Sequence, residues 1–208
     1  MTTGLEAITH NARRLLEDAE LLFSAGSFAT ATALAIIAIE EAGKHYLLKW
    51  SSEHEMIDRV RPAHKGSKGH QAKQSVLGSF YLAEVAVETM RQYLKQIGFE
   101  GNDESLGQFS NALHYLRDDP EYGPKTALVE EKVVKLVAKK MAESEHGEFT
   151  QNAMQGNIQA IKHCGLYVDL DASGEVTSGP NQIRKEDART WLEHAHRAVA
   201  LLSPPNPS

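Results

Sequence analysis

Apolar residues recur along this 208-residue chain at intervals of three and four, the spacing of helices that bury one face. Residues 5–23 form the first such segment, and Gly26 and Ser27 separate it from a second segment at residues 28–50. Ser27 is a favourable N-cap for the second helix. Because residues 33–39 are apolar on every side of that helix, we expect it to lie at the centre of a helical bundle.

Five further helices are predicted after the second one, with glycine and proline residues at most of their ends. Val87 is among the residues expected to face inward in the first of these helices, and Thr126 is the expected N-cap of the third. The predicted ranges are 71–97, 105–117, 126–146, 148–163 and 182–202.

Two segments are predicted to be non-helical. Residues 53–69 contain Pro62 and two glycines, which indicates a loop, and residues 167–177 are predicted to form a short extended excursion around a tight turn. The predicted fold class is therefore all-α. We expect one domain over residues 1–202, with four core helices, one or two accessory helices and a flexible tail at residues 203–208.

The composition is typical of a soluble globular protein, with 41% hydrophobic and 24% charged residues. The longest nearly apolar run, residues 28–39, is shorter than the roughly 20 residues that span a bilayer. No secretory signal is visible at the N-terminus. Cys164 is the single cysteine, which excludes an internal disulfide and fits a reducing compartment. We therefore expect a cytoplasmic protein with no membrane contact.

Positive charge is concentrated in one part of the chain, although the formal net charge is −6. No acidic residue occurs between residues 59 and 83, a segment that also holds His64 and His70. Such a basic strip could hold an RNA phosphate backbone or an acidic protein partner; the alternative is a solvated loop whose lysines keep the chain soluble. The predicted RNA- and phosphate-binding residues are Arg59, Arg61, Lys65, Lys68 and Lys73.

Two adjacent carboxylates, Glu40 and Glu41, interrupt the apolar second helix. Burying a carboxylate costs several kcal/mol unless a partner compensates it. Glu40 and Lys44 are four residues apart, in the order that favours a structural ion pair within one helix. Glu41 lies on the apolar stripe, and if it is buried we expect it to meet a cation from another helix or to have a raised pKa.

Three segments carry a resemblance to a known family. The motif A-x-E-E-x-G-K at residues 38–44, the block at residues 64–68 and the segment at residues 162–169 resemble the AbiV family of abortive-infection proteins. That family belongs to the HEPN superfamily of small helical bundles, many of which are RNA-cutting toxins. The resemblance implies a HEPN-like bundle, a phage-defence effector acting on RNA or the translation machinery, a homodimer, and a phage or antitoxin protein as a further partner.

The HEPN ribonuclease signature is an arginine followed, after four to six residues, by a histidine, and it implies RNA cleavage without a metal. Arg59 and His64 match this spacing. At the later position, where the family usually carries the motif, this chain has Lys162 and Tyr167, and tyrosine is a poor base at neutral pH. The resemblance implies that the catalytic set of a metal-independent endoribonuclease comprises Lys162, Tyr167, His64, Glu41 and Lys44, with the last two in orienting roles.

Two alternatives remain open. The bundle could be a non-catalytic module that binds a protein or a nucleotide, with the Glu-Glu-x-x-Lys pattern fixing the register of the helices and Tyr167 packed against a neighbouring helix. A di-iron bundle would require paired Glu-x-x-His motifs. Residues 143–146 provide a single copy, so we expect no metal and no other cofactor.

Overall fold

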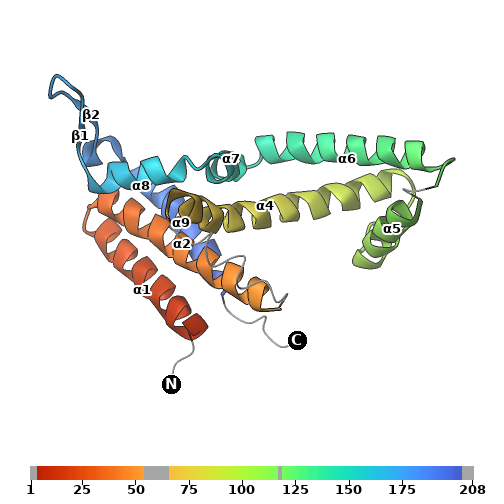
Figure 1. Cartoon of the computed structure of the whole chain (residues 1–208), viewed down its shortest axis with the longest axis horizontal. Helices are drawn as coiled ribbons and strands as arrows, with labels where there is room; N and C mark the ends of the chain where they lie inside the picture. Colours follow the sequence, from red (N-terminus) through yellow and green to blue (C-terminus); the bar gives the residue numbers. More distant parts are fainter. Residues whose placement is uncertain (1–3, 54–65, 117–118, 203–208) are drawn as a thin grey trace. The chain divides into compact units, whose positions relative to one another are not determined.

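The structure is a computed structural model and describes residues 4–53, 66–116 and 119–202 (Figure 1). The described residues form eight α-helices, one short 3₁₀-helix and one two-stranded sheet, which confirms the all-α prediction. They fall into two compact units: residues 1–78 with 151–208, and residues 79–150. The expected tail at 203–208 lies outside the described residues, and the expectation of a single domain stays a prediction.

Helix α2 (Phe28–Glu53) is the centre of the first unit, as the sequence predicts. It packs against α1 (Gly4–Ser24), α8 (Ile158–Leu166) and α9 (Lys185–Ala200), the other three core helices of the unit. Small side chains dominate its buried face, and they allow neighbouring helices to approach closely. The buried apolar residues of α2 are Ala31, Ala33, Ala35, Ile36, Ala38, Ile39 and Ala42.

The end of α9 is tied back to α2 by a tyrosine. The hydroxyl of Tyr46 donates a hydrogen bond to the backbone carbonyl of Leu201, the C-cap residue of α9. Burial raises the pKa of Tyr46 because the phenolate would lose its hydration. A second contact joins α1 to α2, where the Thr9 hydroxyl lies 3.1 Å from Nδ1 of His45.

Two glycines allow helices to cross α2 at close range. A Cβ at Gly165 of α8 would lie 2.6 Å from the carbonyl oxygen of Ala29. A Cβ at Gly43 of α2 would lie 2.7 Å from the carbonyl carbon of Lys73 in α4 (Gly66–Gln96). Real Cβ atoms do not approach that closely, so both crossings require glycine.

A short β-hairpin follows α8, in agreement with the predicted extended excursion. Strands β1 (Asp169–Leu170) and β2 (Val176–Ser178) pair antiparallel, with Leu170 opposite Val176. The turn between them is closed by Asp171, whose carboxylate accepts hydrogen bonds from the backbone N–H groups of Ser173 and Glu175. Gly174 has a φ of +83°, a conformation that glycine adopts without strain.

The second unit comprises the part of α4 from Ser79 onward, α5 (Asp103–Leu116), α6 (Gly123–Glu143) and the first half of α7 (Gly147–Gln155). Helix α6 buries Thr126, Val133 and Met141. Tyr81 of α4 is buried and stacks on His146 with ring centroids 3.9 Å apart. The prediction that Val87 faces inward is wrong, because its side chain is 42% exposed.

Several predicted helix boundaries are also wrong. Helix α4 begins at Gly66, inside the segment predicted to be a loop, and residues 54–65 of that segment lie outside the described residues. Helix α6 begins at Gly123, and Thr126 donates its hydroxyl to the Tyr122 carbonyl instead of capping the helix. Gly156, with a φ of +78°, separates α7 from α8 where one helix was expected.

The last helix begins at Lys185, later than predicted. The 3₁₀-helix η2 (Pro180–Gln182) precedes α9, and Arg184 is the N-cap of α9. The Asp187 carboxylate accepts a hydrogen bond from the Arg184 backbone N–H at 2.9 Å, which satisfies one of the free donors at this helix end. Among the described residues, no helix has the length and apolar character needed to cross a membrane.

Candidate functional site

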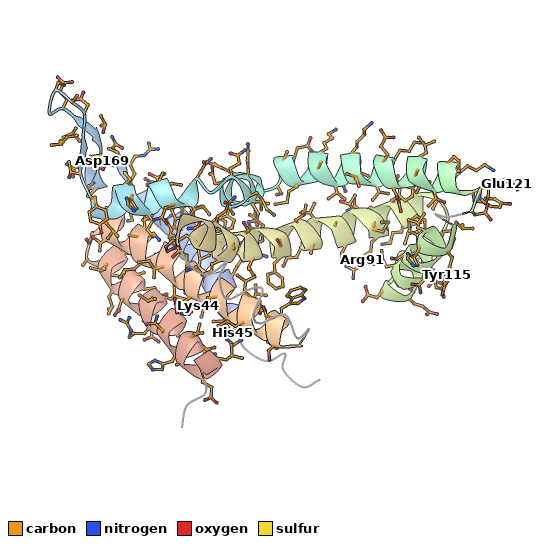
Figure 2. The ribbon with its side chains drawn as sticks, viewed as in Figure 1. Lys44, His45, Arg91, Tyr115, Glu121 and Asp169 are labelled. Carbon is orange, nitrogen blue, oxygen red and sulfur yellow. The ribbon has the colours of Figure 1, made fainter. Side chains whose placement is uncertain are left out.

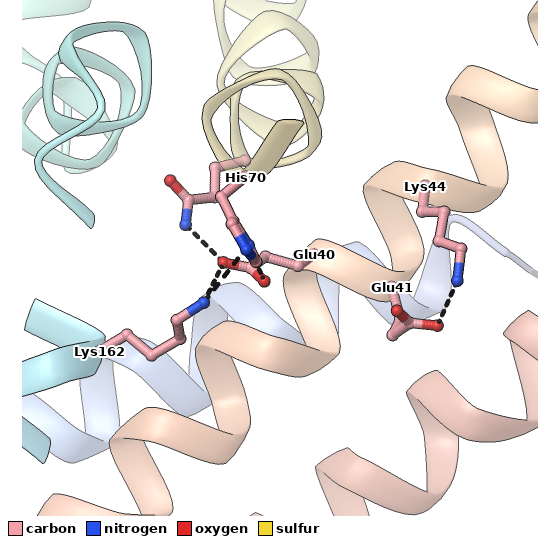
Figure 3. Close-up of polar contacts among 6 residues, drawn as sticks. Glu40, Glu41, Lys44, His70 and Lys162 are labelled. Carbon is pink, nitrogen blue, oxygen red and sulfur yellow. Dashed lines mark hydrogen bonds and ion pairs between the residues drawn. The ribbon is translucent and has the colours of Figure 1, made fainter. Parts of the chain in front are cut away.

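Glu40 lies in the middle of α2 and is 4% exposed. Its Oε1 accepts hydrogen bonds from Lys162 Nζ at 2.8 Å and from Gln74 Nε2 at 2.7 Å. Its Oε2 lies 2.8 Å from Nδ1 of His70 (Figure 3). We call these four residues the Glu40 cluster. The ammonium of Lys162 balances the charge of the carboxylate, which is the condition for burying it at low cost.

Three helices supply the cluster, and the two close crossings position them. Gly43 lies three residues after Glu40 in α2, and it is there that the backbone of α4 crosses, next to His70 and Gln74. Gly165 lies three residues after Lys162 in α8, where α8 crosses α2. Residues three or four apart share a helix face. The close crossing at Gly43 therefore also brings His70 and Gln74 of α4 near Glu40, and the crossing at Gly165 does the same for Lys162 of α8.

The members of the cluster differ in exposure. The side chain of Glu40 is 5% exposed and that of Lys162 is 8% exposed. Gln74 is fully buried, whereas the side chain of His70 is 34% exposed. His70 is therefore the most solvent-exposed side chain of the cluster, while Glu40, Lys162 and Gln74 are almost entirely covered.

The hydrogen bonds assign the tautomer of His70. An ionised carboxylate only accepts hydrogen bonds, so Nδ1 is the donor to Oε2 of Glu40. In the neutral ring the lone pair is then on Nε2. Lys162 Nζ lies 3.5 Å from the same Nδ1, and both groups donate to the one carboxylate.

Glu41 does not join this cluster. It points away from Glu40 in Figure 3, and its Oε2 lies 3.4 Å from Lys44 Nζ on the same helix. The predicted Glu40–Lys44 pair is therefore wrong. Glu41 is only partly buried, so the expectation that a buried Glu41 meets a cation from another helix does not apply to it. Successive residues of a helix point about 100° apart. Glu40 faces α4 and α8, while Glu41 and Lys44 share the neighbouring side of α2. Figure 2 labels Lys44 on this helix.

Tyr167 lies apart from the cluster as well. It is the C-cap residue of α8, its side chain is 56% exposed, and its ring centroid lies 5.3 Å from that of the exposed His163. The alternative in which Tyr167 packs against a neighbouring helix does not fit this exposure. Lys162 and Tyr167 were both predicted to belong to the site. Of the two, only Lys162 contacts another residue of the predicted set, which is Glu40.

The predicted basic strip is described only at its end. Arg59, Arg61, His64 and Lys65 lie outside the described residues, as does the side chain of Lys68, and their proposed roles stay predictions. Lys73 is 8% exposed and its backbone lies against Gly43, which does not fit a phosphate-binding role. In the part of the chain that is described, no three His, Cys, Asp or Glu residues are grouped closely enough to hold a metal ion.

Comparison with known protein families assigns the chain as a whole to a family. The AbiV family model of the HEPN type matches residues 1–200. The chain belongs to the AbiV family. The match confirms the resemblance found in the A-x-E-E-x-G-K motif, and the helical bundle agrees with the HEPN fold. Searches of curated proteins and of solved structures found no match for this AbiV-family protein.

Sequence reasoning missed three residues of the site. His70 was counted only as part of the basic strip, and Gln74 and Gly43 were assigned no role. The available signal was the spacing: His70 and Gln74 are four residues apart and face the same way once a helix covers both. Because residues 53–69 were predicted to be a loop, His70 stood at a helix end and this face was not apparent.

Proposed function

We propose that this AbiV-family protein is an abortive-infection effector of HEPN type that acts on RNA in phage-infected cells. The observation that carries the proposal is the Glu40 cluster, in which the first glutamate of the family motif gathers a lysine and a histidine from two other helices. A carboxylate, an imidazole and an ammonium together are the groups with which proteins move protons on RNA without a metal. The family match supports the biological setting.

A second candidate function is a non-catalytic binding module, and one observation favours it. Lys162 occupies the position of the arginine in the HEPN signature, yet it is 7% exposed and bonded to Glu40. An ammonium held in this way stabilises the bundle and is poorly placed to grip a phosphate. On this view the cluster fixes the register of α2, α4 and α8, and another surface binds the partner.

The experiment uses the purified full-length chain and a phage challenge in cells that express it. The chain is incubated with total RNA and with transfer RNA in the presence of a chelator, and RNA binding is measured in parallel. Chelator-resistant cleavage of RNA, together with fewer phage plaques, is the expected result. The variant Glu40→Gln/Lys162→Met, which dismantles the cluster without changing the net charge, should lose RNA cleavage.

The matched control is Glu131→Gln/Lys135→Met. Lys135 Nζ lies 2.5 Å from Glu131 Oε1, so this is an ion pair as well, but its members are four residues apart on the exposed surface of α6. It removes the same charges and should leave both readouts unchanged. If the chain restricts phage but neither binds nor cleaves RNA at high protein concentration, the RNA proposal is wrong and the binding module is the better account.

A further inference from the structure

We infer that His70 is the catalytic residue that takes the proton from an RNA 2′-hydroxyl, and that Glu40 and Lys162 are positioning residues that hold its ring. This inference rests on the proposed function and names the residue that performs its chemistry. It moves the proton-transfer role from the predicted His64 and Tyr167 to a histidine on α4 that the sequence pattern did not single out.

The first argument is that both carboxylate oxygens of Glu40 are already engaged by side chains of other helices. Its Oε1 is occupied by Lys162 and Gln74, and its Oε2 by His70 Nδ1. Because Lys162 already supplies a balancing charge for the Glu40 carboxylate, the contact between Glu40 and His70 does not require a charged imidazole. The carboxylate therefore fixes the Nδ1–H tautomer and the plane of the ring, and leaves the Nε2 lone pair as a proton acceptor. A histidine base oriented by a carboxylate is a recurrent arrangement for proton abstraction from a hydroxyl.

The second argument is access. The side chain of His70 is 34% exposed, while those of Glu40 and Lys162 are 5% and 8% exposed. A ribose hydroxyl therefore has better access to the side chain of His70 than to that of Lys162. Lys162 then acts on the reaction through Glu40 and not by direct contact with the phosphate.

Two other histidine–carboxylate pairs provide a comparison. His196 lies 2.8 Å from Glu20, whose side chain is 47% exposed, and His146 lies 3.0 Å from Glu145, whose side chain is 81% exposed. Both carboxylates are largely exposed to water, so their contacts with histidine are screened in a way that the contact of a buried carboxylate is not. The pair at His70 differs from these because its carboxylate is buried and bonded to two further donors.

The reaction balances without a metal or an oxidant. Nε2 of His70 removes the proton of the 2′-hydroxyl while the 2′-oxygen forms a bond to the adjacent phosphorus. The bond from phosphorus to the 5′-oxygen breaks, and that oxygen takes the proton back from the imidazolium. The products are a 2′,3′-cyclic phosphate end and a 5′-hydroxyl end, and His70 returns to its neutral form.

The decisive variant is His70→Asn. The asparagine amide can replace Nδ1–H as the donor to Glu40 and so preserve the structural contact, but it offers no group that takes a proton in place of Nε2. We expect cleavage to fall about 100-fold or more, the usual effect of losing a general base, while the thermal unfolding midpoint stays close to that of the unchanged chain. In His70→Ala, added imidazole should restore part of the cleavage rate, since the lost ring is partly exposed.

The matched control is His196→Asn, an equivalent change at the exposed pair with Glu20, which should leave cleavage within about twofold of the unchanged chain, because no base is lost there. Unimpaired cleavage by His70→Asn, or 5′-phosphate instead of 5′-hydroxyl products, would overturn the inference while leaving the RNA function standing. A chain that binds RNA without cutting it would also overturn the inference alone. Failure to bind or cut RNA at all contradicts the proposed function itself.

Discussion

At the scale of single residues, the Glu40 carboxylate joins three helices that are far apart in the sequence. Lys162 is 122 positions away, and Gln74 is 34 positions away. Removing one partner of a buried ion pair leaves an uncompensated charge in a poorly hydrated place, which usually costs more than the pair contributes. The consequences for stability differ between single and double substitutions.

Lys162→Met should destabilise the fold by about 3–5 kcal/mol, because Glu40 then stays buried without its cation. The double variant Glu40→Gln/Lys162→Met should lie closer to the unchanged chain than Lys162→Met does, since it removes both charges together. Urea unfolding of the two single variants and the double variant measures this coupling as a double-mutant cycle. Additive effects would show that Glu40 and Lys162 do not interact in solution.

The sequence predicts this residue-scale picture only in part. A buried acidic pair in a central helix could be inferred from Glu40 and Glu41 standing within an apolar run. The partners could not be inferred, because a partner such as Lys162 depends on which helices touch and with what rotation. The local rule for i,i+4 pairs favoured Lys44 for Glu40, but tertiary contacts override a pair contribution of about 0.2–0.5 kcal/mol.

At the scale of elements, close helix crossings control the geometry of the site. Gly43 and Gly165 each lie one turn beyond a charged residue of the cluster, and each would place a Cβ against backbone atoms of another helix. Backbone atoms cannot move aside as the end of a flexible side chain can. A methyl group at either position must therefore push α4 or α8 away from α2, together with His70 or Lys162.

Gly43→Ala and Gly165→Ala should each destabilise the fold by about 1–3 kcal/mol, the usual range for overpacking, and should lower RNA cleavage as well. Gly107→Ala is the matched control. Gly107 lies inside α5 with no atom within 4 Å of the added Cβ, so alanine should stabilise the helix by about 0.5–1 kcal/mol. Thermal unfolding of the three variants tests the contrast. Similar changes in all three would show that close packing is not the cause.

Element boundaries show where sequence reasoning succeeds and where it does not. The central helix and the extended turn were predicted because their signals are local: a long apolar run and an Asp-Ala-Ser-Gly turn. The start of α4 was missed because Gly66 and Gly69 argue for a loop when read alone, while contact with α2 at Gly43 supports a helix there. The break at Gly156 requires a positive φ that composition alone does not reveal.

The stability of the hairpin turn is expected to decrease at acid pH. Hydrogen bonds from the Ser173 hydroxyl and the Glu175 backbone N–H lower the pKa of Asp171. The folded pKa lies below the unfolded value, so the stabilising contribution is present above the unfolded pKa and is lost as pH falls through the folded one. Amide resonances of Ser173 and Glu175 should shift with a midpoint below 3.8, the ordinary aspartate value. This titration should disappear in Asp171→Asn, and a midpoint at or above 3.8 would contradict the assignment.

At the scale of the whole molecule, the first unit is assembled from both ends of the chain, since residues 1–78 and 151–208 share one core. The contacts of α2 with α8 and α9 therefore join residues that are more than a hundred positions apart. Such contacts carry a high loop-closure cost, which slows folding. The Glu40 cluster depends on contacts of this kind. No short sequence window therefore contains the whole site.

The proposed RNA binding requires a local surface, because the net charge of −6 opposes binding of RNA to the molecule as a whole. The predicted surface is the basic strip that includes Lys65 and Lys68. If both lysines contact phosphates, Lys65→Gln/Lys68→Gln should weaken binding and reduce the slope of log affinity against log salt by about 1.4, at roughly 0.7 per contact with single-stranded RNA. Lys132→Gln/Lys135→Gln removes two exposed lysines of α6 and is the matched control. Filter binding across a salt series gives both slopes. Equal changes in the two variants would mean that the acidic protein attracts RNA only through its overall charge, and the basic strip would lose its proposed role.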